Sequence, residues 1–123
     1  MRRIATLWLL GSIWSCSKDR APSPAEIADR GWRAHELAVI AGERAARCAD
    51  AGAAMQQVIA DHRQDFVAAL ALDQDRERLR QATDWLEAHG ERYQDLEARM
   101  AALSERCAGD ASVRAAFAQM ESP

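Results

Sequence analysis

Residues that suit a seam between packed helices, most of them apolar, recur at alternating spacings of three and four positions over two long stretches of the chain. The first seam consists of Leu79, Ala82, Leu86, His89, Tyr93, Leu96, Met100, Leu103 and Cys107, and the second of Ile27, Gly31, Ala34, Ala38, Ala41, Ala45 and Cys48. This spacing is typical of the a and d positions of helices that pack lengthwise against other helices. No run alternates with period two for long enough to indicate a strand, so the sequence predicts an all-α fold.

The second seam predicts a first helix over residues 24–48, and Gly52 is suited to end it. A second helix is then expected over residues 53–72. The heptad spacing continues through Gly52 to Met55 without a change of phase. One unbroken helix over residues 24–72, forming one arm of a long hairpin, is therefore the alternative.

The polar segment 73–75 marks the next turn, and the third helix carries the first seam to Cys107. Ser112 is expected to cap a short last helix that reaches Met120. The predicted architecture is an antiparallel helical bundle of three long helices plus a short C-terminal helix.

The start of the first helix has a strong local signal. Ser23 can serve as its N-cap, Pro24 suits the first helical position, and Glu26 completes a capping box with Ser23. The polar, proline-containing segment before it has the composition of a short extended linker. We therefore expect a flexible tether over residues 16–23 and a helical bundle domain over residues 24–121.

The beginning of the chain has the composition of an export signal. Arg2 and Arg3 precede an apolar run over residues 4–10, which is too short to span a bilayer as a helix. The residues that follow, Ile13-Trp14-Ser15-Cys16, resemble the lipobox of bacterial lipoproteins. In that family a signal peptidase cuts before the cysteine, which then carries a diacylglyceryl group and an amide-linked acyl chain such as palmitate.

The resemblance implies a signal peptide over residues 1–15, lipidation at Cys16 and the lipid bilayer as a partner through the acylated cysteine. By the sorting rule of the family, Ser17 at the next position, in place of aspartate, implies transport to the outer membrane. We therefore expect an exported protein anchored to the cell envelope and facing the periplasm.

The charge of the chain argues against nucleic acid as a partner. The 16 basic residues fall to 14 when Arg2 and Arg3 leave with the leader, against 19 acidic residues, which gives a net charge of about −5. Arginines and acids interleave along the helices at spacings of three and four, which is typical of a solvated, ion-paired helix surface.

Cys48 and Cys107 each end one seam, and two such cysteines in an exported protein usually pair. With a tight turn at Gln74, however, the helix rise separates their sulfurs by more than about 10 Å. A shift of one heptad brings them opposite each other, if residues 73–80 serve as the connection. The shifted register also pairs Met55 with Met100, His62 with Tyr93 and Phe66 with His89.

Three histidines, His35, His62 and His89, are spaced 27 residues apart. In the shifted register His62 and His89 lie on facing seams, with Met55 and Met100 nearby. Imidazole and thioether side chains can ligate copper, zinc or haem iron, so His62 and His89 are the candidate metal ligands. No His-x-x-x-His or Cys-x-x-Cys-His motif supports them, and we predict no cofactor.

The sequence contains no Gly-x-Ser-x-Gly elbow and no phosphate-binding glycine loop, so we expect no enzymatic activity. The leading hypothesis is a lipid-anchored binding or structural module that presents a helical face to a protein partner. The alternative is a small periplasmic bundle that binds a metal or haem through His62 and His89.

Overall fold

The computed structural model describes residues 20–123, so the leader, the lipobox-like segment and Cys16 lie outside the described residues. Over this part of the chain the fold is all-helical, as predicted, with no strand. The elements are α1 (Pro24–Arg44), α2 (Cys48–Asp61), α3 (Arg63–Ala71), the 3-10 helix η2 (Leu72–Gln74), α4 (Arg76–Ala88), α5 (Gly90–Arg106) and α6 (Ala111–Glu121).

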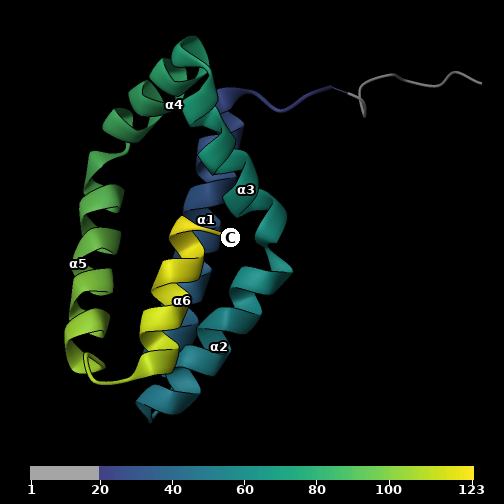
Figure 1. Cartoon of the computed structure of the whole chain (residues 1–123). Coiled ribbons are helices and arrows are strands. Elements are labelled where there is room, and N and C mark those ends of the chain that lie inside the picture. The colour runs from purple at the N-terminus through teal and green to yellow at the C-terminus, as the bar shows by residue number, and fades with distance from the viewer. Residues whose placement is uncertain (1–19) are drawn as a thin grey trace, which may run out of the picture.

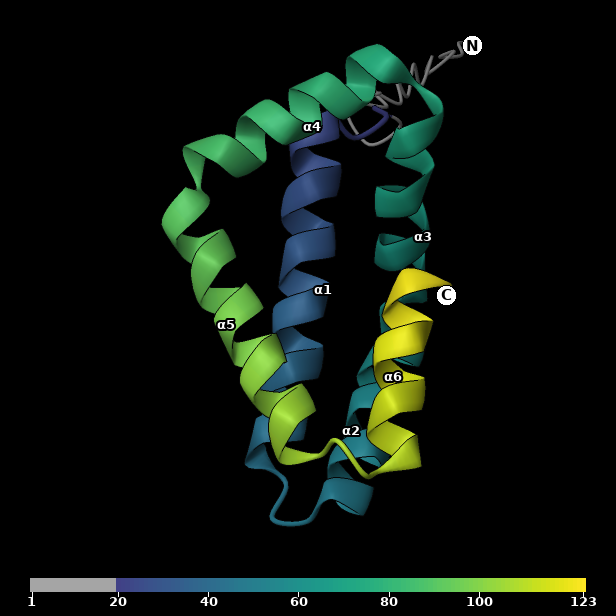
Figure 2. The same cartoon turned by 60° about the vertical axis from the view of Figure 1, so that its left-hand side comes forward.

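The helices run up and down the molecule, with α4 lying across one end (Figures 1 and 2). α1 descends, α2 and α3 return, α4 crosses, α5 descends, and α6 returns about halfway. α1 and α5 consequently run parallel. Two ion pairs between them, Arg92 with Glu36 at 2.6 Å and Arg99 with Glu43 at 2.5 Å, have the same sequence separation of 56 residues.

The predicted capping box at the start of α1 is confirmed. The Glu26 amide donates to the Ser23 hydroxyl oxygen at 3.1 Å, and the Ser23 amide donates to the Glu26 carboxylate at 3.3 Å. Pro24 occupies the first turn. The local sequence is sufficient here because all the partners lie within four residues.

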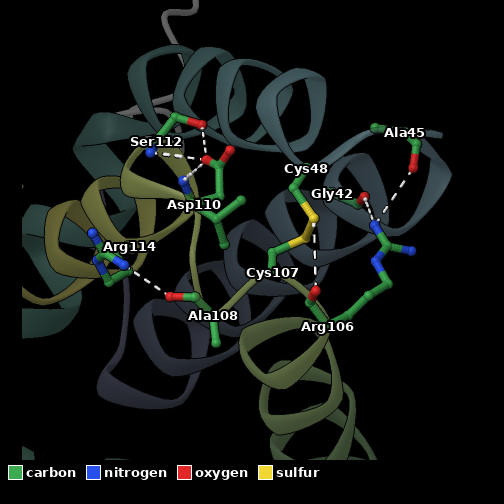
Figure 3. The surroundings of a disulfide bond; sticks show 10 residues. Gly42, Ala45, Cys48, Arg106, Cys107, Ala108, Asp110, Ser112 and Arg114 are labelled. Carbon is green, nitrogen blue, oxygen red and sulfur yellow. Dashed lines mark hydrogen bonds between the residues drawn. A yellow bond between two sulfur atoms is a disulfide. The ribbon is translucent and has the colours of Figure 1, made fainter.

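The first turn lies at residues 45–47, between α1 and α2, and not at Gly52. Both the expected helix over residues 24–48 and the alternative continuous helix over residues 24–72 are therefore wrong. The Arg106 guanidinium explains part of the difference, because it donates to the carbonyl oxygens of Gly42 at 3.2 Å and Ala45 at 3.4 Å (Figure 3). A cation from a distant helix thus stabilises the carbonyl oxygens at the end of α1.

The second and third predicted helices are each broken at a histidine. His62 takes φ −111° and ψ 20° between α2 and α3, and His89 takes φ −115° and ψ 33° between α4 and α5. These dihedral angles lie outside the α-helical region. The three long helices that the seams predicted are therefore five shorter ones, and the bend at His89 turns α4 across the end of the molecule (Figure 2).

The predicted connection over residues 73–80 is also shorter than expected. η2 makes the turn, and the Asp75 carboxylate accepts from the amides of Glu77 at 3.0 Å and Arg78 at 3.1 Å. α4 is helical from Arg76 onward. The last helix differs in its cap, because Asp110 and not Ser112 receives the first free amides of α6.

The disulfide between Cys48 and Cys107 is confirmed, with a distance of 5.5 Å between the Cα atoms (Figure 3). Two other pairs of the shifted register are wrong. Tyr93 packs on Trp32 with ring centroids 5.2 Å apart, and Phe66 packs on His35 at 4.7 Å. The pairing of His62 with Tyr93 and of Phe66 with His89 fails because α5 packs along α1 rather than along the second predicted helix.

Two core clusters hold these helices together, and both consist of residues between 27 and 120. The larger one fills the space between α1, α2, α5 and α6 with residues such as Val39, Met55, Leu103 and Val113. The smaller one, beside α4, consists of Ile27, Ala28, Leu72 and Ala82. Among the helices within residues 20–123, none has both the length and the apolar character to cross a membrane.

Gly52 lies buried in the interior of α2, where α6 packs against it. A Cβ atom added at this position would come within 2.0 Å of the Ser112 hydroxyl oxygen and 2.6 Å of the Ser112 carbonyl carbon. The glycine therefore permits a close approach of two helices and does not end one.

We expect Gly52→Ala to lower the free energy of unfolding by about 1–3 kcal/mol, because the α2–α6 contact must open. Gly90→Ala is the matched control, since a Cβ atom at Gly90 meets nothing within 4 Å. The control should be neutral or stabilising by up to about 1 kcal/mol. Urea unfolding followed by circular dichroism measures both, and equal effects of the two substitutions would contradict the close approach.

Candidate ligand-binding cavity

A cavity of about 560 Å³ lies between α1, α4, α5 and the turn at η2. Its size is within the range of small-molecule sites in proteins. The lining residues are Ala28, Gly31, Trp32, His35, Ala69, Leu72, Asp73, Leu79, Ala82, Thr83, Leu86, Tyr93, Leu96, Glu97 and Met100. Most of this wall is apolar, and the N-terminal part of the Leu79–Cys107 seam supplies much of it.

Small side chains and a short last helix account for the open space. Ala28, Ala69 and Ala82 line the cavity from α1, α3 and α4 and leave room that larger side chains would fill. α6 ends about halfway along the molecule and supplies no lining residue (Figure 2). α4, turned by the bend at His89, closes the end without filling the space beneath it.

Two aromatic side chains form one wall. The rings of Trp32 and Tyr93 lie 5.2 Å apart, tilted by 41°. The Trp32 indole N–H donates to the Glu36 carboxylate, which also accepts from Arg92. Tyr93 is 39% exposed and Leu79 is 37% exposed. These two partly exposed side chains mark the rim, where the cavity meets solvent.

His35 is the one histidine in the cavity wall. Its Nδ1 lies 2.7 Å from the Gly31 carbonyl oxygen, and its ring packs against Phe66. Because a carbonyl oxygen can only accept, Nδ1 carries the proton and Nε2 offers a lone pair. Burial lowers the pKa of His35 more than the bond to Gly31 raises it, so the ring is neutral at pH 7.

Two carboxylates, Asp73 on η2 and Glu97 on α5, complete the polar part of the lining, and both residues are exposed. A hydrogen bond from the Tyr93 hydroxyl to Glu97 raises the pKa of Tyr93, with burial adding to the shift. The Thr83 hydroxyl donates a hydrogen bond to the Leu79 carbonyl oxygen at 2.9 Å. The negative charge of the site therefore lies at its solvent-exposed side.

The structure does not bring the candidate ligands His62 and His89 together. They lie at the α2–α3 and α4–α5 junctions, on opposite sides of the molecule (Figure 2). His62 is half-buried with Nδ1 3.5 Å from Asp65, and the exposed His89 stacks on Trp85 with ring centroids 4.1 Å apart. Within residues 20–123, no group of three or more His, Cys, Asp or Glu side chains is placed to hold a metal ion.

His35 was not predicted as a site residue because it lies one position beyond the narrow α1 seam, next to Ala34. The many alanine and glycine residues of the facing helices could have indicated the cavity. Such small side chains leave unfilled volume wherever the helices do not approach closely. Neither candidate ligand, His62 or His89, lines the cavity, whereas Met100, which the shifted register placed near them, does.

No protein-family model, curated protein or solved structure matches this chain. The assignment of a function therefore depends on the chemistry of the cavity and on the sequence itself.

The burial of His35 predicts a pH dependence of stability. The pKa of this residue is lowered in the folded protein from its ordinary value of 6.5, so the unfolded chain binds the additional proton first as the pH falls. The free energy of unfolding should consequently decrease as the pH drops below about 6.5, until the folded state is protonated as well.

His35→Phe keeps a ring against Phe66 and should reduce this slope. Urea unfolding between pH 5 and pH 8 measures the effect, and the values at pH 8 show whether the variant is folded normally. Identical slopes for the variant and the parent protein would show that His35 is not the titrating group.

Proposed function

We propose that this protein is an exported, lipid-anchored and non-enzymatic binding protein of the cell envelope that takes up a small, largely apolar ligand. The observation that carries the proposal is the cavity of about 560 Å³ with its apolar wall. An apolar hollow of this size forfeits packing contacts and exposes apolar surface to water. A ligand that fills it would supply the missing packing contacts and would remove the apolar surface from water.

Two features of the wall support binding without catalysis. His35 directs Nδ1 to a backbone carbonyl oxygen rather than to an orienting carboxylate. The cavity lining, as far as it is made of described residues, contains a threonine but no serine or cysteine that could act as a nucleophile.

The proposed anchor at Cys16 would hold the cavity close to a membrane. Pro24, the first residue of α1, follows Cys16 by eight positions, which limits the span between them to about 30 Å. α1 begins at the end of the molecule that α4 crosses (Figure 2). The cavity would thus lie at the tethered end of the domain, within reach of molecules that partition into the bilayer.

The presentation of a helical face to a protein partner stays a prediction. The exposed large apolar side chains of the described residues are Leu37, Val67, Leu70, Leu79 and Tyr93. Two of these, Leu79 and Tyr93, belong to the cavity wall. The geometry therefore favours a small ligand as the first binding activity to test.

For the anchor, we expect Cys16→Ala to abolish incorporation of labelled palmitate and to release the protein from the membrane fraction or stall its processing. Ser17→Asp is the matched control, because it should keep lipidation and alter only sorting between the two membranes. Unchanged labelling and fractionation of Cys16→Ala would refute the anchor.

For the cavity, we expect residues 17–123, which contain both core clusters and the disulfide, to bind the neutral probe 2-(1-naphthyl)ethanol in calorimetric titrations. Leu79→Gln should weaken this binding about tenfold, because it places an amide at the apolar rim. Leu70→Gln is the matched control, since Leu70 has a similar exposure of 42% but lies outside the cavity. Absence of binding, or equal effects of the two substitutions, would contradict the proposal.

A further inference from the structure

We infer that the cavity selects hydrophobic amines, that is, ligands with an apolar body and a protonated ammonium group. This inference rests on the proposed function and names the ligand class of the same site. The preference follows from the direction of each hydrogen bond in the wall and from the sign of each charge there.

The polar N–H and O–H groups of the cavity wall already donate hydrogen bonds to acceptors of the protein. The Trp32 indole N–H donates to Glu36, and the Thr83 hydroxyl donates to the Leu79 carbonyl oxygen. The Tyr93 hydroxyl interacts with the Glu97 carboxylate, and this interaction raises the pKa of Tyr93. Within the described part of the wall, no side chain retains a free N–H or O–H for a ligand, so a ligand that needs a donor finds none.

Acceptors, in contrast, remain available. Nε2 of His35 forms no hydrogen bond with any residue in the range 20–123, and it is not sealed from solvent. The Asp73 and Glu97 carboxylates and the Thr83 hydroxyl oxygen have further lone pairs. A ligand is therefore bound best if it brings the donors itself, as an ammonium group does with up to three N–H bonds.

The charges of the lining favour a cation as well. The lining contains Asp73 and Glu97 but no arginine or lysine. Arg92 lies near, 6.0 Å from the centre of the Trp32 ring, but Glu36 at 2.6 Å and Asp29 at 3.6 Å offset its charge. The partly exposed ring of Tyr93 offers additional attraction to an ammonium group by cation–π interaction.

The same arrangement disfavours anionic ligands. The carboxylate of a fatty acid or the propionates of haem would meet Asp73 and Glu97 and would find no side-chain donor in the wall. The site therefore differs in kind from the haem or metal site predicted at His62 and His89. That site would have held its ligand by coordination of a metal ion and not by hydrogen bonds and charge.

Three probes that share a naphthalene body but differ in charge test the inference on residues 17–123. They are 2-(1-naphthyl)ethylammonium, 2-(1-naphthyl)ethanol and 1-naphthylacetate. The ammonium probe should bind at least about tenfold more tightly than the acetate, since one charge-assisted hydrogen bond contributes this much. The alcohol, which can donate once, should lie between them.

Two variants locate the source of the preference. Glu97→Gln combined with Asp73→Asn should reduce the ratio of ammonium to acetate affinity to about threefold or less, with little effect on the alcohol. Both residues are exposed, so the variant is expected to fold. Glu105→Gln is the matched control, because it removes one charge from the same helix outside the cavity and should keep the full ratio.

His35→Phe separates the acceptor from the charges. It should weaken the ammonium and alcohol probes by about fivefold or more and leave the acetate unchanged, because only the first two can donate to Nε2. If all three probes bind equally, or if the acetate binds best, the selection of amines is wrong while the apolar cavity stands. If none of the probes binds, the proposed function fails as well.

Discussion

The disulfide between Cys48 and Cys107 closes one end of this molecule, and the arrangement of the other elements depends on that closure. It joins the first residue of α2 to the residue that follows α5, across a sequence separation of 59. In the chain-entropy model, a loop of this length raises the free energy of unfolding by about 4 kcal/mol, a large part of the stability of a small domain. Arg106, beside Cys107, holds the end of α1, and the contact of Gly52 with Ser112 brings α6 against α2. Three independent constraints thus meet at the same end.

The opposite end has few such constraints, and the cavity lies there. α4 contributes one buried residue, Ala82, whereas α1 contributes eight. The bend at His89 turns α4 across the molecule, so that its side chains cover the space between α1 and α5 without filling it. Most of the buried core belongs to the larger cluster, so unfilled volume and exposed apolar side chains at this end remove only a small part of the core contacts.

The features that the sequence predicted correctly have one of two causes. Some depend on interactions within a few residues, and others depend on a hydrophobic repeat that extends over a whole helix. Ser23 and Glu26 form their capping box from local chemistry, and the seams correctly place Leu96 and Leu103 in the core. The turn at residues 45–47 contains no glycine or proline, and its partner Arg106 is distant in sequence. The break at His62 has no local signal either, while Gly90 offered one beside His89. The cavity could not be predicted because its volume follows from these breaks and from the parallel packing of α5 on α1.

One end of the protein is closed by the disulfide and the other holds the cavity. This difference determines which part of the protein a ligand would stabilise. The larger core cluster has fourteen buried residues, and the cluster beside α4 has four, two of them alanines. An apolar body in the cavity would contact both Leu96 of the first cluster and Ala82 of the second. Of the partly buried apolar side chains, Trp85 is the one that packs against both clusters. Because a ligand stabilises the state that binds it, its effect should be largest for the element with the fewest contacts of its own. The ligand would therefore act as the missing part of the core at the end where α4 lies, and its ammonium group would remain at the rim with Glu97 and Asp73.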